Sequence, residues 1–312
     1  MDFSNQFGLF AVLFMLFWFM SQLIVGLFIK VLERYSIFNH ERLLWVLASI
    51  PIALPTTVLV ALWLVGWAKH HGWLDQHCDG RYGVLFCHQE IMTQEPGFSA
   101  FWLGFGGLLL AFILISAISK LIHSHIKAKS LLRLVQSKGA KRLVKLPESQ
   151  AYAFVLGVRQ PVILWSNQLE KCLSKYQQRM VLAHEIQHIR RQDILKNIIF
   201  ELLLAFHLSP KTLRRYWQLN MELQVDEQLS NRFNRIAMAE LLLKLRRESL
   251  TPQPGLAFTG SVLQKRIERL IYPHRQSKLN IEWFVWSLLV LVLLFTGIEH
   301  HSVEWLIAWI GL

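Results

Sequence analysis

Charged residues and cysteine are scarce in this sequence of 312 residues. Only three residues are Cys, which excludes a small fold held together by a framework of disulfides. Charged residues make up 17%, with 21 Asp and Glu against 33 Lys and Arg. Hydrophobic residues make up 53%, with 12 Trp and 20 Phe, which is too apolar and too aromatic for an average soluble domain. The composition indicates a membrane protein.

Four apolar stretches are long enough to cross a bilayer, which requires about 20 residues. They lie at roughly 7–30, 43–68, 98–122 and 281–298. The first lacks a basic n-region and a small-residue cleavage site, so we interpret it as a retained span and not as a signal peptide. Pro51 and Pro55 in the second are tolerated where neighbouring helices satisfy the freed carbonyls. We therefore predict an α-helical membrane protein with four transmembrane helices.

Basic residues give the orientation of these spans. They are concentrated near the membrane ends of 31–42 and throughout 123–280, whereas the loop 69–97 carries more acidic than basic residues. The positive-inside rule places the two basic segments in the cytoplasm, and the N-terminus, the loop and the C-terminal tail outside. The predicted division is 1–122 with three spans and the external loop, 123–280 as a cytoplasmic domain, and 281–312 with the fourth span and a short external tail.

The net charge of +12 lies mostly in 123–280. A nucleic acid could attract such a charge, but the basic residues crowd the ends of the spans, where anionic lipid would attract them. We expect membrane lipid as the partner and no direct binding of nucleic acid.

Two of the three cysteines, Cys78 and Cys87, fall in the predicted external loop, where an oxidising compartment permits a disulfide. We predict that they are paired. His77 and His88 flank them, so a metal-binding loop is the alternative. Cys172 falls on the cytoplasmic side and is expected to be a thiol.

Local patterns predict a small sheet followed by helices in 123–280. Residues 141–146 alternate like a strand, and 151–165 reads as two short strands around the turn GVRQP. Ser174 and Gln177 form a capping-box pattern at the start of a helix. Further helices are expected from near Asp193 and at about 211–230, 235–249 and 261–272. The apolar run 194–208, ended by Pro210, is short for a span, so we expect it to be buried or to lie against the membrane.

The stretch VLAHEIQHIRRQD, residues 181–193, contains two histidines four residues apart with a glutamate beside the first. On a helix, His184 and His188 lie one above the other and can bind one zinc ion. In an H-E-x-x-H motif the glutamate, here Glu185, takes a proton from the attacking water and passes it to the leaving amine. The competing interpretation is an ordinary helix with solvated His and Glu side chains.

A second matched pair favours the zinc site. Glu222 lies 34 residues beyond His188, and Asp226 follows it by four residues on the same helical face. Glu222 can supply the third ligand, and Asp226 can accept a hydrogen bond from the second nitrogen of a zinc-bound histidine. Asp193 is a second candidate for the shell behind the ligands, with Asp226. It could instead cap the next helix or pair with Arg190 or Arg191, and we favour such a structural role for it.

Other polar residues near the motif are less informative. His207 lies on an apolar helix and is expected to be a satisfied core histidine. For the oxyanion, the spacing does not choose among Arg214, Arg215 and Tyr216.

The stretch AHEIQHIRRQD, followed by ELQVD and preceded by FVLGVRQPVIL, resembles the BlaR/MecR-type membrane metallopeptidases, the transmembrane antirepressors of β-lactam resistance and their relatives. The resemblance covers the four-span plan and is strongest over 150–230. It implies a gluzincin-like zinc peptidase domain between the third and fourth spans, on the cytoplasmic side of a bacterial inner membrane, with one Zn²⁺ per chain. By position, His184 and His188 match the zinc histidines, Glu185 the catalytic glutamate and Glu222 the third ligand.

Receptors of this type carry a large external penicillin-binding sensor after the fourth span, whereas this sequence ends at Leu312, so we expect no such sensor in this chain. The leading hypothesis is an integral-membrane zinc endopeptidase in regulated proteolysis, with a cytoplasmic substrate for which the resemblance implies a helix-turn-helix repressor. The alternatives are a housekeeping protease of the HtpX/Ste24 type, which acts on membrane proteins, and a non-catalytic signalling scaffold. The oligomeric state, including a homo-oligomer, is left open.

Overall fold

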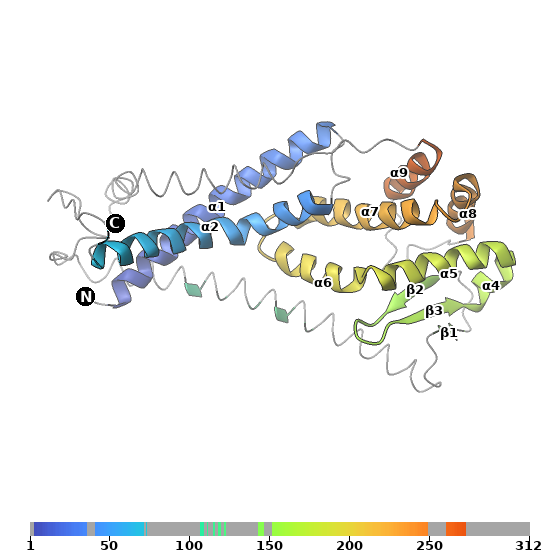
Figure 1. Ribbon diagram of the computed structural model, residues 1–312, viewed down its shortest axis with the longest axis horizontal. Coiled ribbons are helices and arrows are strands. Elements are labelled where there is room, and N and C mark those ends of the chain that lie inside the picture. The colour runs from blue at the N-terminus through green and yellow to red at the C-terminus, as the bar shows by residue number, and fades with distance from the viewer. Residues whose placement is uncertain are drawn as a thin grey trace.

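The computed structural model describes residues 3–35, 41–71, 73, 143–146, 152–248 and 260–272, with a few single helical residues between 107 and 122 (Figure 1). The fourth predicted span and most of the third lie outside these residues, as do Cys78 and Cys87. The described part is mostly helical, with one small sheet. The plan of four spans, the gluzincin-like fold, the domain boundaries and the disulfide therefore stay predictions.

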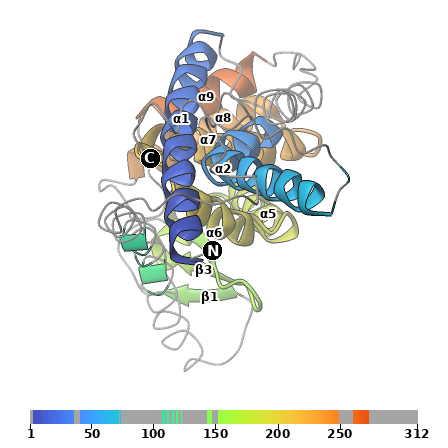
Figure 2. The same cartoon turned by 90° about the vertical axis from the view of Figure 1, so that its left-hand side faces the viewer.

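Two long apolar helices form the N-terminal part, α1 (Phe3–Tyr35) and α2 (Glu41–His70). Both are long and apolar enough to cross a membrane, over Leu13–Lys30 and Glu41–Ala61, with mean hydropathies of 1.9 and 2.1. They lie side by side and run in opposite directions (Figures 1 and 2). Pro51 and Pro55 lie inside α2, as the sequence predicts for a membrane helix.

The sheet has three strands, β1 (Leu143–Leu146), β2 (Ala153–Leu156) and β3 (Val162–Ser166), in the order β1-β3-β2. The predicted hairpin is confirmed, because β2 and β3 pair antiparallel. Gly157 begins the turn with φ of 94°, a conformation that glycine adopts at little cost. The parallel pairing of β1 with β3 is not predicted, since nothing local specifies it.

Six helices follow among the described residues after the sheet, and the sequence predicts five of them. Their bounds are α4 (Asn167–Cys172), α5 (Lys175–Arg190), α6 (Asp193–Leu204), α7 (Pro210–Leu229), α8 (Arg235–Glu248) and α9 (Gly260–Ile271). The capping box of Ser174 and Gln177 is present at the start of α5. The missed helix, α4, has only six residues, too few to show a period. Pro210 does not end α6 directly but is the first residue of α7, where its missing N–H costs nothing.

Two apolar cores share α7. One gathers side chains of the sheet, α4, α5, α7, α8 and α9. The other joins α1 and α2 to α6 and α7, and in it the rings of Phe200 and Trp217 stack 4.4 Å apart while Trp45 of α2 meets both rings edge-on. His207 is buried as predicted, with its Nε2 3.0 Å from the carbonyl oxygen of Ala48. The helices α6 and α7 thus pack directly onto the two long apolar helices, and α5 packs on α6 and α7.

Candidate active site

The two histidines of α5 and the glutamate of α7 meet between these helices. Nε2 of His184 lies 3.1 Å from Nε2 of His188 and 3.2 Å from Oε2 of Glu222. Oε1 of Glu222 lies 3.7 Å from Nε2 of His188. The four-residue spacing on α5 brings the two rings edge to face, with centroids 4.8 Å apart, and the packing of α7 on α5 brings in the third side chain.

These three side chains fit a zinc ion. Two ligand atoms, each about 2.0–2.1 Å from one ion at a tetrahedral angle, are separated by about 3.3 Å. One ligand atom from each residue lies within 4.8 Å of the other two, and the shortest separations are 3.1 and 3.2 Å. Two imidazoles and one carboxylate are also the donor set of a catalytic zinc site that keeps its fourth position for water.

A carboxylate lies behind each histidine. Oδ2 of Asp193 lies 2.7 Å from Nδ1 of His188, and Oδ1 of Asp226 lies 3.5 Å from Nδ1 of His184. An ionised carboxylate only accepts hydrogen bonds, so Asp193 places the proton of neutral His188 on Nδ1 and leaves Nε2 free to bind a metal. Asp226 is positioned to do the same for His184, as the sequence analysis anticipates.

Asp193 also pairs with Arg191, whose Nε lies 3.2 Å from its Oδ1. The pair with Arg191 is one that the sequence predicts. The predicted capping role is wrong, because the N-cap of α6 is Gln192 and Asp193 is the first helical residue. Gln192 adopts the left-handed conformation with φ of 56°. This costs about 1 kcal/mol or more in a non-glycine residue, but it turns the chain sharply enough to bring Asp193 back to His188.

A buried arginine completes the site, and the sequence analysis missed it. Arg266 of α9 is only 3% exposed and donates to both oxygens of Asp226, at 2.7 and 2.9 Å. Its Nη1 lies 2.8 Å from Oε2 of Glu222. The basic residues of 123–280 are predicted to lie near the membrane surface, whereas Arg266 is buried and compensates the buried Asp226 and the partly buried Glu222.

The charges set the protonation of the site. Burial acts to raise the pKa of Glu222, but the charge of Arg266 and the hydrogen bond with His184 hold it well below its ordinary value. Burial raises the pKa of Glu185, against the opposing effect of the two histidines. In the metal-free protein, burial acts to lower the pKa of His188, but the hydrogen bond with Asp193 and the nearby carboxylates raise it to about 9. The site therefore combines an ionised ligand with a buried carboxyl of raised basicity.

Two of the residues considered for the oxyanion, Arg214 and Tyr216, make contacts with other side chains. Nε and Nη2 of Arg214 donate to the two carboxylate oxygens of Glu201, at 2.6 Å each. The amine of Lys265 lies 5.5 Å from the centre of the Tyr216 ring. Neither contact points to an oxyanion role. Among the described Lys and Arg side chains, the one that contacts a candidate ligand is Arg266, at 2.8 Å from Glu222.

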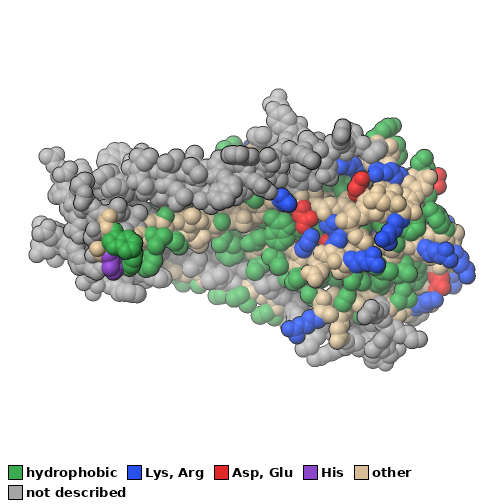
Figure 3. Space-filling model, in the orientation of Figure 1, with side chains coloured by type: hydrophobic (Ala, Val, Ile, Leu, Met, Phe, Trp, Pro, Cys, Tyr) green, Lys and Arg blue, Asp and Glu red, His purple; other side chains and the backbone are tan. Residues whose placement is uncertain are grey.

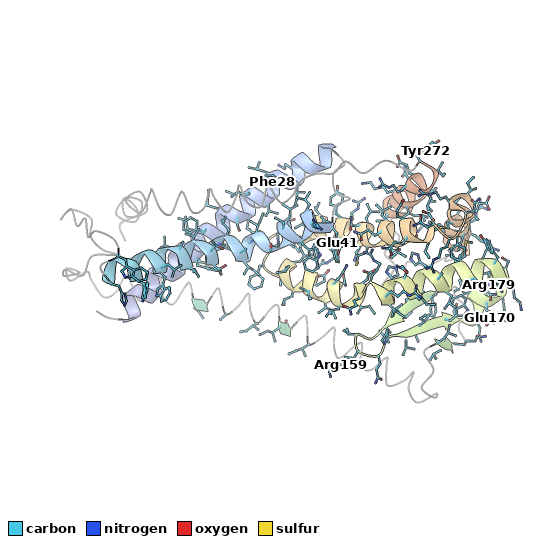
Figure 4. All side chains as sticks on the ribbon, in the orientation of Figure 1. Phe28, Glu41, Arg159, Glu170, Arg179 and Tyr272 are labelled. Carbon is cyan, nitrogen blue, oxygen red and sulfur yellow. The ribbon has the colours of Figure 1, made fainter. Side chains whose placement is uncertain are left out.

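Ion pairs tie α2 to this site. Oε1 of Glu41, in the first turn of α2, lies 2.7 Å from the amine of Lys196 on α6. Its other oxygen lies 3.7 Å from Arg191, which also donates to Gln224 of α7 at 2.6 Å. Glu41 lies at the end of α2 that meets α6 and α7 (Figure 4). A chain of contacts thus runs from the membrane helix through Arg191 and Asp193 to His188.

Two histidines one turn apart, a downstream glutamate and carboxylates behind the histidines define the metallopeptidase class of site. The comparison with known families agrees: the family model described as BlaR1 peptidase M56 matches residues 89–271. The chain belongs to this family, and membership indicates a membrane metallopeptidase. No curated protein matches the chain.

Proposed function

We propose that this protein is a zinc-dependent endopeptidase of the membrane, in which His184, His188 and Glu222 hold one zinc ion. The observation that carries the proposal is the separation of the ligand atoms, 3.1 and 3.2 Å, with a carboxylate behind each histidine. An ordinary helix would leave its His and Glu side chains in water, whereas the side chains of His184, His188 and Glu222 are only 15–20% exposed. A non-catalytic scaffold would likewise not require a buried carboxyl group at Glu185, next to the candidate ligands.

Zinc bound there would polarise a water molecule and the peptide carbonyl. Glu185 takes a proton from the attacking water and passes it to the leaving amine. Because burial raises its pKa, Glu185 is a stronger base than an exposed glutamate and returns the proton more readily than one with a low pKa. Asp193 and Asp226 hold the histidine rings in place, and Arg266 fixes Glu222 and Asp226.

The substrate is expected to bind as an extended peptide. The strand β2 is at an edge of the sheet formed by the described strands, and α5 packs against it. An extended segment can add to such an edge through main-chain hydrogen bonds, which select shape more than sequence. The target is therefore an accessible segment of a cytoplasmic protein or a juxtamembrane segment of a membrane protein.

The basic residues of 123–280 support a cytoplasmic site in a multi-pass inner-membrane protein with external termini. Reporter fusions test this placement. Fusions after Lys145 and after Lys278 should behave as cytoplasmic, and those near Asp79 and after His300 as external. An external signal at Lys145 would overturn the orientation.

A small DNA-binding repressor is the first candidate substrate, and membrane proteins are the second, as in a housekeeping protease. The test is to express the protein with a repressor encoded beside it and to follow the size of the repressor. Cleavage in the wild type but not in Glu185→Gln supports the regulator. An intact repressor, with membrane proteins accumulating in the Glu185→Gln strain, supports the housekeeping role.

A further inference from the structure

We propose that the hairpin formed by α6 and α7 enters the cytoplasmic half of the bilayer, with one face of α6 in contact with lipid acyl chains. The hairpin points its connection, residues 205–209, toward the end of the molecule that carries the N-terminus, alongside α1 and α2 (Figure 1). It would anchor the candidate active site at the membrane surface, and this consequence rests on the proposed function.

The connection contacts α1 and α2 inside their apolar segments. Nε1 of Trp18 and Nε2 of Gln22 both donate to the carbonyl oxygen of Phe206 at 3.0 Å. Nε2 of His207 lies 3.0 Å from the carbonyl oxygen of Ala48. The tip of the hairpin is therefore fixed to both membrane helices by polar contacts.

The position of these contacts gives the depth of the tip. Gln22 precedes Lys30, the end of the apolar segment of α1, by eight residues, and Ala48 follows Glu41, the start of that of α2, by seven. At 1.5 Å per residue, the tip lies about 10–12 Å inside these ends. At the base of the hairpin, Lys196 pairs with Glu41 itself. The hairpin thus extends from the edge of the apolar segments to about a third of a bilayer's hydrocarbon thickness of about 30 Å.

The amides of residues 205–208 in the tip donate to protein groups, as hydrocarbon requires. Irregular backbone is tolerated at membrane depth only where the protein supplies its hydrogen bonds. The amide of Leu208 donates to Oε1 of Gln22 at 3.1 Å, and the amides of Phe206 and His207 bond back to α6. Pro210 has no amide hydrogen to satisfy. In water, solvent would satisfy these backbone groups, and the hydrogen bonds from the side chains of Trp18 and Gln22 on α1 would not be required.

The outer face of α6 is apolar and uncovered by the described residues. Its exposed residues are Leu195, Ile199 and Leu202, which share one face at helical spacing, and Leu208 at the tip is 63% exposed. On α1, Leu23 and Leu27 are exposed next to Gln22, at the depth of the hairpin. The face of α6 therefore continues the lipid-facing surface of α1, and acyl chains are the occupant that matches both. On the face drawn in Figure 3, charged side chains gather over the half of the described surface away from the N-terminal end of α1.

The charges of the hairpin suit this position. Glu201 and Arg214 neutralise each other through two contacts of 2.6 Å, as ionisable pairs inside membranes do. Lys211 and Arg215 are exposed on α7 and have long side chains that can extend toward the headgroups.

Spin labels measure this directly. Single cysteines at Ile199 and Leu208 are labelled in a version of the full chain whose three cysteines are replaced by serine, and the protein is reconstituted in liposomes. Collision rates with oxygen, which enriches in lipid, and with a water-soluble nickel chelate are compared. Leu27 on α1 is the lipid control, and Ile236, 64% exposed on α8, is the aqueous control. Variants whose elution volume differs from the wild type are excluded.

Labels at Ile199 and Leu208 should favour oxygen several-fold more than the label at Ile236, as the label at Leu27 does. Access of the nickel chelate equal to that at Ile236 would place the hairpin in water and overturn the proposal. Exclusion of both reagents would also overturn it, because another segment or a second copy then covers the face. Proteolysis is not measured, so failure here is distinguishable from failure of the peptidase assignment.

Discussion

Arg266 of α9 contacts Glu222 of α7, with Nη1 2.8 Å from Oε2. The same guanidinium holds both oxygens of Asp226, so one buried cation fixes a candidate zinc ligand and the carboxylate behind a second. A helix that follows α5 by some seventy residues is therefore part of the active-site structure.

Replacing Arg266 with Met should destabilise the protein by about 3–5 kcal/mol, because the buried Asp226 and the partly buried Glu222 lose their compensating charge. Thermal unfolding in detergent measures the change, together with zinc content. The matched control is Arg269→Met on the same helix, which should change stability little. Equal midpoints for the Arg266→Met protein and the wild type would mean that the arginine does not compensate these charges.

Asp193→Asn should weaken zinc binding about 10–100-fold, the usual effect of removing a partner behind a metal-bound histidine. The amide can present its NH₂ group to Nδ1 and so no longer fixes the tautomer of His188. Competition with a chelator gives the affinity. Glu227→Gln, an exposed change on α7, serves as the control and should bind zinc like the wild type. Unchanged affinity in Asp193→Asn would remove Asp193 from the site.

Zinc affinity should rise with pH up to about 9. In the metal-free protein the pKa of His188 is raised from 6.5 to about 9, so the ring is protonated at neutral pH and must lose this proton to bind zinc. The raised pKa of His188 also affects folding. The protonated ring stabilises the metal-free protein fully below pH 6.5, and this contribution is lost as the pH rises through about 9. Calorimetry in buffers of different ionisation enthalpy counts the protons. Asp193→Asn should release fewer protons than the wild type at pH 8, and an equal number would contradict the assignment.

The pair of Glu41 and Lys196 should couple α2 to α6 by about 1 kcal/mol, since both side chains are partly exposed. A double-mutant cycle with Glu41→Gln and Lys196→Met, read from thermal unfolding, gives the coupling. Lys211→Met, on the same hairpin, replaces Lys196→Met in the control cycle and should show none. Additive effects of Glu41→Gln and Lys196→Met would show that the pair does not couple the helices.

What could be predicted from the sequence is local. Ser174 and Gln177 are three residues apart, and His184 and His188 are four apart, as are Glu222 and Asp226, so a helical period is enough to relate them. The start of α5 and the hairpin of β2 and β3 follow from such short-range patterns.

What could not be predicted depends on contacts between distant segments. Glu41 and Lys196 are 155 residues apart, and β1 pairs with β3 across a connection that the chain's local pattern does not specify. Arg266 did leave a signal: Val262, Leu263 and Leu270 form the buried face of α9, and Arg266 occupies a position in that apolar stripe. An arginine at such a position needs a buried partner, and Asp226 is that partner.

The central claim is tested most directly by proteolysis with purified wild type and Glu185→Gln, measured beside their zinc content. Glu185 is the base and not a ligand, so the variant should retain one zinc per chain and lose cleavage of an unfolded protein such as casein, by at least about 100-fold. Glu222→Gln, which removes a ligand, should lose the metal. Equal cleavage by wild type and Glu185→Gln would contradict the assignment of this site as the peptidase centre.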